Sequence, residues 1–241
     1  MSEKKWRTAA IVLAAGQGRR MHSEVAKQFL ILGGEPVVCH SLRAFEQSPA
    51  EAVVLVTGEE EIDYCRKQIV EAYGFKKVIA VVAGGKERYH SVYAGLCALE
   101  ENLDPDGIVM IHDGARPLIT EEIIERTIVD AELYGASVAA MPVKDTIKVA
   151  DASGFAALTP DRSTLWQMQT PQTFSYGLVL KAYRKLMSDE KYQKGITDDA
   201  MVVENLCGTK VKLTEGSYEN IKVTTPEDMV IAEALLRKRN G

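Results

Sequence analysis

The chain has 241 residues, of which 46% are hydrophobic and 26% are charged, and its formal net charge is −5. This length is enough to bury a sizeable core, and the ordinary composition excludes a largely disordered chain. The acidic balance argues against a general nucleic-acid-binding surface or a basic membrane patch, although a local cationic pocket remains compatible with it. We expect no nucleic-acid partner and no membrane partner.

The cysteines and the apolar runs limit the remaining classes of protein. Four cysteines are scattered without a CxxC pair, so we expect neither a zinc site nor a disulfide framework. The apolar run 9–15 follows Lys4, Lys5 and Arg7, but glycines and arginines come where a signal peptide would continue. No apolar run approaches the roughly 20 residues that span a bilayer. A cytoplasmic protein is the expected class.

The first half of the chain alternates between two kinds of pattern. Apolar runs without polar alternation predict strands covered on both faces, over 9–15, 52–57, 78–83, 108–111 and 136–141. Helical spacing lies between them, over 36–48, 59–73, 88–102 and 120–134. The alternation predicts an α/β fold, a mostly parallel doubly wound (Rossmann-like) sheet with helices on both faces. In such sheets, ligands bind beyond the carboxyl ends of the strands.

The pattern changes after Pro142. Residues 143–150 alternate, 151–154 are typical of a turn and 155–158 return, which predicts a β-hairpin. We expect a β-arm at about 142–165 that reaches a second subunit, with a surface flap on a monomer as the alternative. No repeat or linker divides the chain, so we expect one domain over 1–241.

The remaining pattern predicts further helices and strands. Thr197 is expected to cap a helix that begins at Asp198, with acidic side chains at its positive end. Pro226 follows a capping Thr225 and opens the final helix. The other predicted elements are a helix over 175–188 and strands over 211–214 and 220–224.

A glycine-rich turn follows the first predicted strand. Gly16 and Gly18 suggest a dinucleotide fingerprint, but its third glycine would fall on Met21, and no Walker A loop occurs. Exposed backbone N–H groups followed by Arg20 and Lys27 instead predict a cradle for phosphate. A plain strand-to-helix turn with a solvated basic face remains the alternative.

Two later segments end strands on the same edge of the predicted sheet. The first is Gly84-Gly85-Lys86-Glu87-Arg88 with Ser91, and the second runs from His112 to Pro117. An aspartate beside phosphates is a suitable Mg²⁺ ligand, so Asp113 is a candidate, with a local loop-holding role as the alternative. We expect His112 to pack or hydrogen-bond locally.

Taken together, the motifs resemble those of the 2-C-methyl-D-erythritol 4-phosphate cytidylyltransferases. The resemblance rests on Leu13-Ala14-Ala15-Gly16-x-Gly18-x-Arg20-Met21, Lys27-Gln28, Gly84-Gly85-x-x-Arg88-x-x-Ser91, His112-Asp113-Gly114-Ala115-Arg116-Pro117, Asp145-Thr146, Asp161-Arg162, Gln169-Thr170-Pro171-Gln172, Thr197-Asp198-Asp199-Ala200 and Asn220-Ile221-Lys222. It spans nearly the whole chain. The first motif is shared with many sugar-nucleotide pyrophosphorylases, whereas the ordered set is specific for the cytidylyltransferases.

The resemblance implies transfer of CMP from CTP to a polyol phosphate, with Mg²⁺ or another divalent cation as cofactor. It implies catalytic roles for Arg20, Lys27 and Lys222, and a metal-binding role for Asp113. The implied nucleotide-binding residues are Leu13, Ala14, Ala15, Gly16, Gly18, Gly85, Arg88, Ser91, Asp113 and Ala115. Lys86 and Glu219 depart from residues found in some members, so neither is included in the site.

The resemblance also implies that a homodimer shares the active site. The implied acceptor-binding residues are Arg116, Thr146, Arg162 and Thr170. Arg162 suits a phosphate because a guanidinium can donate two parallel hydrogen bonds. Two alternatives stay open, a ribitol 5-phosphate cytidylyltransferase and a catalytically silent nucleotide-binding module. We expect methylerythritol phosphate as the acceptor.

Overall fold

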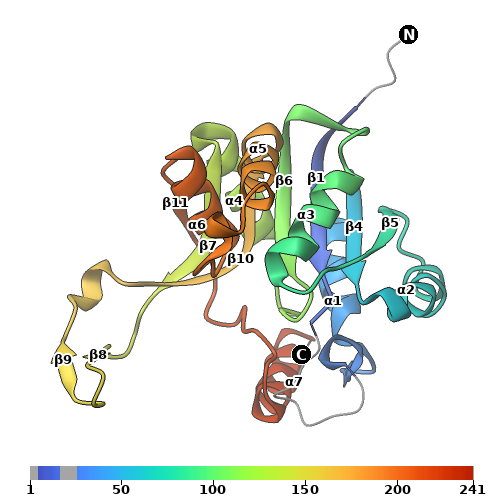
Figure 1. Cartoon of the computed structure of the whole chain (residues 1–241). Helices are drawn as coiled ribbons and strands as arrows, with labels where there is room; N and C mark the ends of the chain where they lie inside the picture. Colours follow the sequence, from blue (N-terminus) through green and yellow to red (C-terminus); the bar gives the residue numbers. More distant parts are fainter. Residues whose placement is uncertain (1–4, 17–25, 241) are drawn as a thin grey trace.

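A seven-stranded sheet forms the centre of the molecule, with the strand order β11-β7-β10-β6-β1-β4-β5 (Figure 1). The computed structural model describes residues 5–16 and 26–240. The strands are β1 (Trp6–Leu13), β4 (Ala52–Thr57), β5 (Val78–Ala83), β6 (Leu103–Asp113), β7 (Ala136–Pro142), β10 (Trp166–Ser175) and β11 (Lys212–Glu215). β10 is antiparallel to β6 and β7, and the other neighbouring pairs are parallel. The predicted mostly parallel sheet is confirmed.

Helices cover both faces of this sheet, as predicted. They are α1 (Val37–Gln47), α2 (Ile62–Tyr64), α3 (Arg88–Ala98), α4 (Glu121–Tyr134), α5 (Tyr176–Met187) and α6 (Asp199–Cys207). The last helix, α7 (Pro226–Asn240), packs in a separate small core. One core cluster includes Phe45 of α1 and Ile124 of α4, and the other includes Leu96, Tyr183 and Val203 of α3, α5 and α6. All six residues of β4 are buried, which explains their unbroken apolar run.

Residues at both ends of α4 show why this helix begins and ends where it does. Glu121 and Glu122 lie in the first turn, where carboxylates interact favourably with the helix dipole. Gly135 follows the last turn with φ 81°, a left-handed conformation that glycine adopts without a steric penalty. The helix therefore ends there and the chain turns into β7.

Three local predictions were wrong in detail. The predicted helix over 59–73 consists of a 3₁₀ turn (Glu59–Glu61), α2 and a π-helical segment (Cys65–Glu71). β6 is longer than the predicted 108–111. Asp198, and not Thr197, caps α6, because its carboxylate accepts a hydrogen bond from the Met201 N–H at 2.9 Å.

Residues 220–224 were predicted to form a strand and do not. Their backbone groups pair with loops and side chains instead of a neighbouring strand: the Val223 N–H donates to the Ala115 carbonyl at 2.8 Å, and the Asn220 carbonyl accepts from Arg116 at 2.7 Å. Val223 also packs in a small core with Ala232 of α7 and with Leu32 of the short β2 (Ile31–Leu32), which pairs with β3 (Glu35–Pro36). The segment is thus an extended strap between the sheet and α7.

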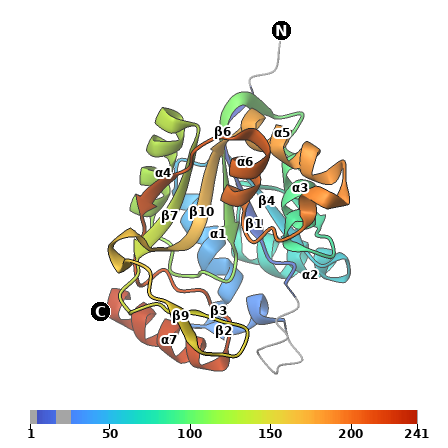
Figure 2. The same ribbon diagram turned by 60° about the vertical axis from the view of Figure 1, so that its left-hand side comes forward.

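An arm extends from the sheet between β7 and β10 (Figures 1 and 2). It contains the antiparallel pair β8 (Val149–Ala150) and β9 (Ala156–Leu158), which confirms the predicted hairpin in a shorter form. Apolar side chains are exposed along it, among them Ile147, Phe155 and Leu158. Contact with a second subunit through this arm stays a prediction.

Candidate active site

A cavity of about 680 Å³ opens at the carboxyl ends of β1, β5 and β6. β1 lies between β4 and β6, so the cavity lies where the direction of strand addition reverses, the usual ligand site of doubly wound sheets. Its lining residues are Leu13, Ala14, Ala15, Gly16, Lys27, Gln28, Gly85, Lys86, Glu87, Arg88, Ser91, Asp113, Ala115 and Lys222. Cationic side chains outnumber carboxylates in this lining, which suits a polyphosphate.

The cavity brings together most of the residues predicted to bind the nucleotide or to catalyse its transfer. Gly18 and Arg20 lie outside the described residues. Arg116 and Thr170 lie close by but do not line the cavity, and Thr146 and Arg162 are exposed on the arm. The strand-end motifs, far apart in the sequence, therefore meet as the parallel topology requires.

Close backbone contacts shape the floor of the cavity. The Gly114 N–H donates to the Leu13 carbonyl at 2.8 Å, which ties the loop after β6 to the end of β1. A Cβ on Gly84 would lie 2.6 Å from both the Ala15 Cβ and the Ser91 Oγ. The Ser91 hydroxyl in turn accepts from the Gly85 N–H at 3.1 Å. Glycine at 84 is thus required for the loop after β5 to approach both the loop after β1 and Ser91.

Lys27 enters the cavity from a 3₁₀ turn, Lys27–Phe29. Its Nζ donates to the Val223 carbonyl at 3.0 Å. The adjacent Gln28 is buried and donates its amide to the Ala14 carbonyl. Lys27 is therefore anchored between the β1 loop and the strap.

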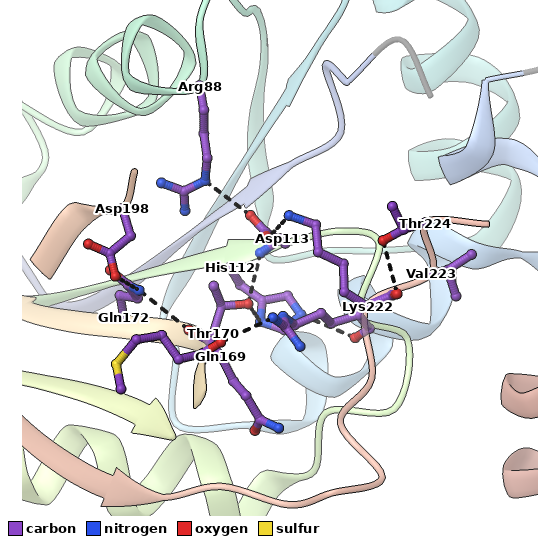
Figure 3. A network of polar contacts seen from close by, with 12 residues as sticks. Arg88, His112, Asp113, Gln169, Thr170, Gln172, Asp198, Lys222, Val223 and Thr224 are labelled. Carbon is purple, nitrogen blue, oxygen red and sulfur yellow. Dashed lines mark hydrogen bonds and ion pairs between the residues drawn. The ribbon is translucent and has the colours of Figure 1, made fainter. Parts of the chain in front are cut away.

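Asp113, the last residue of β6, is the central carboxylate of the site (Figure 3). Its Oδ1 accepts from Arg88 Nε at 3.2 Å, and its Oδ2 accepts from Lys222 Nζ at 2.6 Å. Burial raises the pKa of Asp113, but Arg88, Lys222 and Arg116 lower it more, so the net pKa is well below the ordinary value. The carboxylate is thus charged at every physiological pH.

His112 lies directly behind this carboxylate (Figure 3). The Asp113 N–H donates to Thr170 Oγ1 at 3.1 Å, and Thr170 Oγ1 lies 3.0 Å from His112 Nδ1. His112 Nε2 lies 3.2 Å from the Arg116 carbonyl, so the neutral Nε2–H tautomer satisfies both ring nitrogens. His112 is fully buried and hydrogen-bonded locally, as expected. Thr170 here positions Asp113.

The burial of His112 predicts a pH dependence of stability. Burial, opposed by Asp113 and reinforced by Arg116, lowers its pKa to about 4. Between pH 6.5 and 4 the unfolded chain binds the proton and the folded chain does not, so stability falls as the pH falls. We expect the wild type to lose about 2 kcal/mol more than His112→Asn in free energy of unfolding between pH 7 and pH 5. Urea unfolding at the two pH values measures this difference, and equal losses in the two proteins would contradict it.

Arg116 is committed to the strap in this structure. Its Nη1 donates to the Asn220 carbonyl at 2.7 Å, and its Nε has no hydrogen-bond partner among the described residues. The Asn220 amide also donates to the Thr170 carbonyl at 2.9 Å. Arg116 and Asn220 therefore hold the segment that carries Lys222, and a contact of Arg116 with the acceptor stays a prediction.

Several residues of the site were not predicted. Gln28 and Glu87 line the cavity, and each lies beside a predicted residue; Gln28 also belongs to the motif Lys27-Gln28 that carried the resemblance. Asp199 forms a two-point ion pair with Arg88, and Gln172 binds the backbone of Asp199. Both belong to motifs that carried the resemblance but had no assigned role.

The fold and the cavity together are those of a nucleotidyltransferase of the doubly wound α/β class, with a cavity at the strand ends in which cationic side chains predominate. Residues 8–238 match the family model described as 2-C-methyl-D-erythritol 4-phosphate cytidylyltransferase. The chain belongs to this family.

The chain aligns with individual relatives over nearly their whole length. The chain is 50% identical over 232 residues to the 2-C-methyl-D-erythritol 4-phosphate cytidylyltransferase of Lachnospira eligens, covering 95% of this chain and 98% of the relative. It is 47% identical over 234 residues to the enzyme of the same name from Alkaliphilus oremlandii, covering 97% and 96%. The crystal structure of 4-diphosphocytidyl-2C-methyl-D-erythritol synthase from Anaerococcus prevotii matches with a TM-score of 0.80 at 33% identity, covering 95% and 96%. In the described part of this chain, no helix is long and apolar enough to cross a membrane.

Proposed function

We propose that this protein transfers CMP from CTP to the phosphate of 2-C-methyl-D-erythritol 4-phosphate and releases pyrophosphate, a step of non-mevalonate isoprenoid synthesis. The observation that carries the proposal is the meeting of Lys27, Asp113 and Lys222 in one cavity at the strand ends of a chain that belongs to this family. The product is 4-diphosphocytidyl-2-C-methyl-D-erythritol.

The chemistry requires placement and charge neutralisation more than proton transfer. An oxygen of the acceptor phosphate attacks the α-phosphorus of CTP, and the bond to the bridging oxygen of pyrophosphate breaks. Because the nucleophile is already an anion, no general base is needed. Charge builds on the pentacoordinate phosphorus, where preorganised cations stabilise it most.

Three cations of the chain suit this task. Lys27 lies in the 3₁₀ turn after the β1 loop, and Lys222 lies in the strap. Lys27 donates to the Val223 carbonyl, and Lys222 donates to Asp113. Arg20 is proposed as the third, on the resemblance alone. The cytosine and ribose are assigned to the backbone edges near Ala15, Gly85 and Ser91, where fixed N–H and C=O groups distinguish an exocyclic amine from a carbonyl.

The donor set fits a Mg²⁺ ion held mainly by phosphate oxygens. Among residues 5–16 and 26–240, no group of three or more His, Cys, Asp or Glu side chains forms a metal cluster. Asp113 is an ionised carboxylate on the cavity wall, and each of its oxygens keeps a lone pair beside its contact with a cation. Asp113 would hold the ion, which would supply further neutralisation of the triphosphate.

The acceptor side is proposed to form across a dimer. Arg162 lies on the arm, where its Nη1 donates to the Lys144 carbonyl at 2.8 Å, leaving its remaining donors toward solvent. Thr146 is exposed on the same arm. Burial of the exposed apolar side chains of the arm against a second copy of the chain would stabilise such a dimer.

Arg162→Ala tests this shared site. We expect the variant to bind CTP as the wild type does and to raise the KM for the acceptor by at least about tenfold, the loss of one charge-assisted contact to phosphate. Lys148→Ala removes another exposed cation from the arm and is the control, with unchanged KM. A monomer in sedimentation that is fully active would contradict the shared site.

Pyrophosphate release with CTP and each of two acceptors tests the proposed function. We expect efficient turnover with 2-C-methyl-D-erythritol 4-phosphate and little with ribitol 5-phosphate. A clear preference for ribitol 5-phosphate would overturn the proposed acceptor. Binding of CTP without turnover on either acceptor would favour a silent binding module.

A further inference from the structure

A buried carboxylate, Asp199, lies in the first turn of α6 and has no solvent exposure. Its Oδ1 accepts from Arg88 Nη1 and its Oδ2 from Arg88 Nη2, both at 2.8 Å. Such two-point pairs fix both the distance and the plane of a guanidinium. Arg88, which lines the cavity, is thus oriented by a buried residue that does not line it.

The orientation of Arg88 determines what remains for Asp113. With both terminal nitrogens on Asp199, Arg88 offers Asp113 only its Nε, on Oδ1. Oδ2 is left to Lys222. If the pair with Asp199 were lost, the terminal nitrogens of Arg88 could turn to Asp113 and occupy both oxygens, in competition with Lys222.

Asp199 is itself held by contacts from β10 and α5. Gln172 Oε1 on β10 accepts from the backbone N–H groups of Asp199 and Ala200, at 3.0 and 2.9 Å. Gln172 Nε2 donates to Asp198, the residue that caps α6 (Figure 3). The Tyr183 hydroxyl of α5 donates to Asp199 Oδ1. The carboxylate therefore has one position relative to the sheet.

We propose that Asp199 is a positioning residue for nucleotide transfer, which acts through Arg88 to keep one oxygen of Asp113 available to Lys222 and to a cation that accompanies the triphosphate. The inference rests on the proposed function, since it concerns the same cavity. Asp199 itself touches no substrate, because its side chain is enclosed by α5, α6 and Arg88. Its effect on catalysis must pass through Arg88.

A double-mutant cycle of Asp199→Asn and Arg88→Gln separates this role from a contribution to folding. The measurements are kcat with CTP and the acceptor, the Kd of CTP by calorimetry, and thermal unfolding. Each single variant is expected to lower kcat by about 10- to 100-fold, the scale of a misplaced catalytic geometry, and to weaken CTP binding. The double variant is expected to have the same kcat and Kd as the poorer single variant, because both substitutions remove the same Asp199–Arg88 ion pair.

Val203→Ala is the matched control. Val203 is a buried residue of α6 that packs in the core and makes no contact in the ion-pair network. It is expected to lower the melting temperature while kcat and Kd stay at wild-type values. Arg88→Lys keeps the charge but cannot satisfy both carboxylates, so it tests the same point should Asp199→Asn fail to fold.

Wild-type kcat and Kd in folded Asp199→Asn or Arg88→Lys would overturn the inference. Losses that multiply in the double variant would also overturn it, since Asp199 would then act independently of Arg88. If the wild type binds CTP but releases no pyrophosphate with the acceptor, the proposed function fails. The Kd cycle still decides whether Asp199 positions Arg88.

Discussion

Replacing Lys27 by alanine is expected to lower kcat by about two to three orders of magnitude, with a folded protein that keeps its melting temperature. The side chain lines the cavity, and its Nζ is held at 3.0 Å from the Val223 carbonyl. A preorganised cation of this kind contributes most where charge develops in the transition state, and the loss of one such contact has this size. Steady-state pyrophosphate release measures the effect.

Lys181→Ala is the matched control for this experiment. Lys181 is an exposed lysine of α5 and does not line the cavity. We expect its removal to change kcat by less than about threefold, because an exposed charge is screened by solvent. An unchanged kcat in folded Lys27→Ala would remove Lys27 from the mechanism.

Asp113→Asn is expected to lower both stability and turnover. Asp113 faces Arg88 and Lys222, and Arg116 also contributes to its low pKa. Neutralising it removes the carboxylate partner of Lys222 and one of the two carboxylate partners of Arg88. Because these side chains are 39% and 30% exposed, we expect a cost of about 2 kcal/mol rather than that of a fully buried pair. We expect kcat to fall by at least about 100-fold, since the cations lose their placement as well. Urea unfolding and steady-state assays measure the two effects.

A surface pair provides the control for the loss of stability. Asp104 pairs with Arg7 at 3.2 Å, and the Arg7 side chain is 63% exposed. Asp104→Asn is expected to change the free energy of unfolding by less than about 1 kcal/mol and to leave kcat unchanged. Equal losses of free energy of unfolding in Asp113→Asn and Asp104→Asn would contradict a larger contribution of the Asp113 network to stability.

Strands β1, β4, β5, β6 and β7 could be predicted because unbroken apolar runs show their burial. β10 was not predicted as a strand, because Gln, Thr and Pro residues interrupt its apolar pattern. Residues 52–57 and 78–83 form strands with the predicted bounds, since unbroken apolar runs reflect cover on both faces. Once the sheet was mostly parallel, Gly16, Gly85 and Asp113 had to meet at one edge. The cavity residues followed from that topology together with the resemblance.

Other features depend on contacts between distant residues and carry no local pattern. Residues 220–224 alternate as a strand does, but Arg116, Ala115 and Lys27 satisfy their backbone groups in place of a neighbouring strand. The pairing of Arg88 with Asp199 joins residues 111 positions apart. Neither could be read from spacing, because each partner lies on a different element.

The fate of oxygen in the acceptor phosphate tests the central claim most directly. The protein is incubated with CTP and 2-C-methyl-D-erythritol 4-phosphate whose terminal phosphate oxygens carry ¹⁸O, and the masses of both products are measured. We predict that every label stays in the cytidylylated product, including its diphosphate bridge, and that the pyrophosphate is unlabelled. Label in the pyrophosphate, or CTP that remains unconsumed, would contradict transfer of CMP to the acceptor phosphate by this protein.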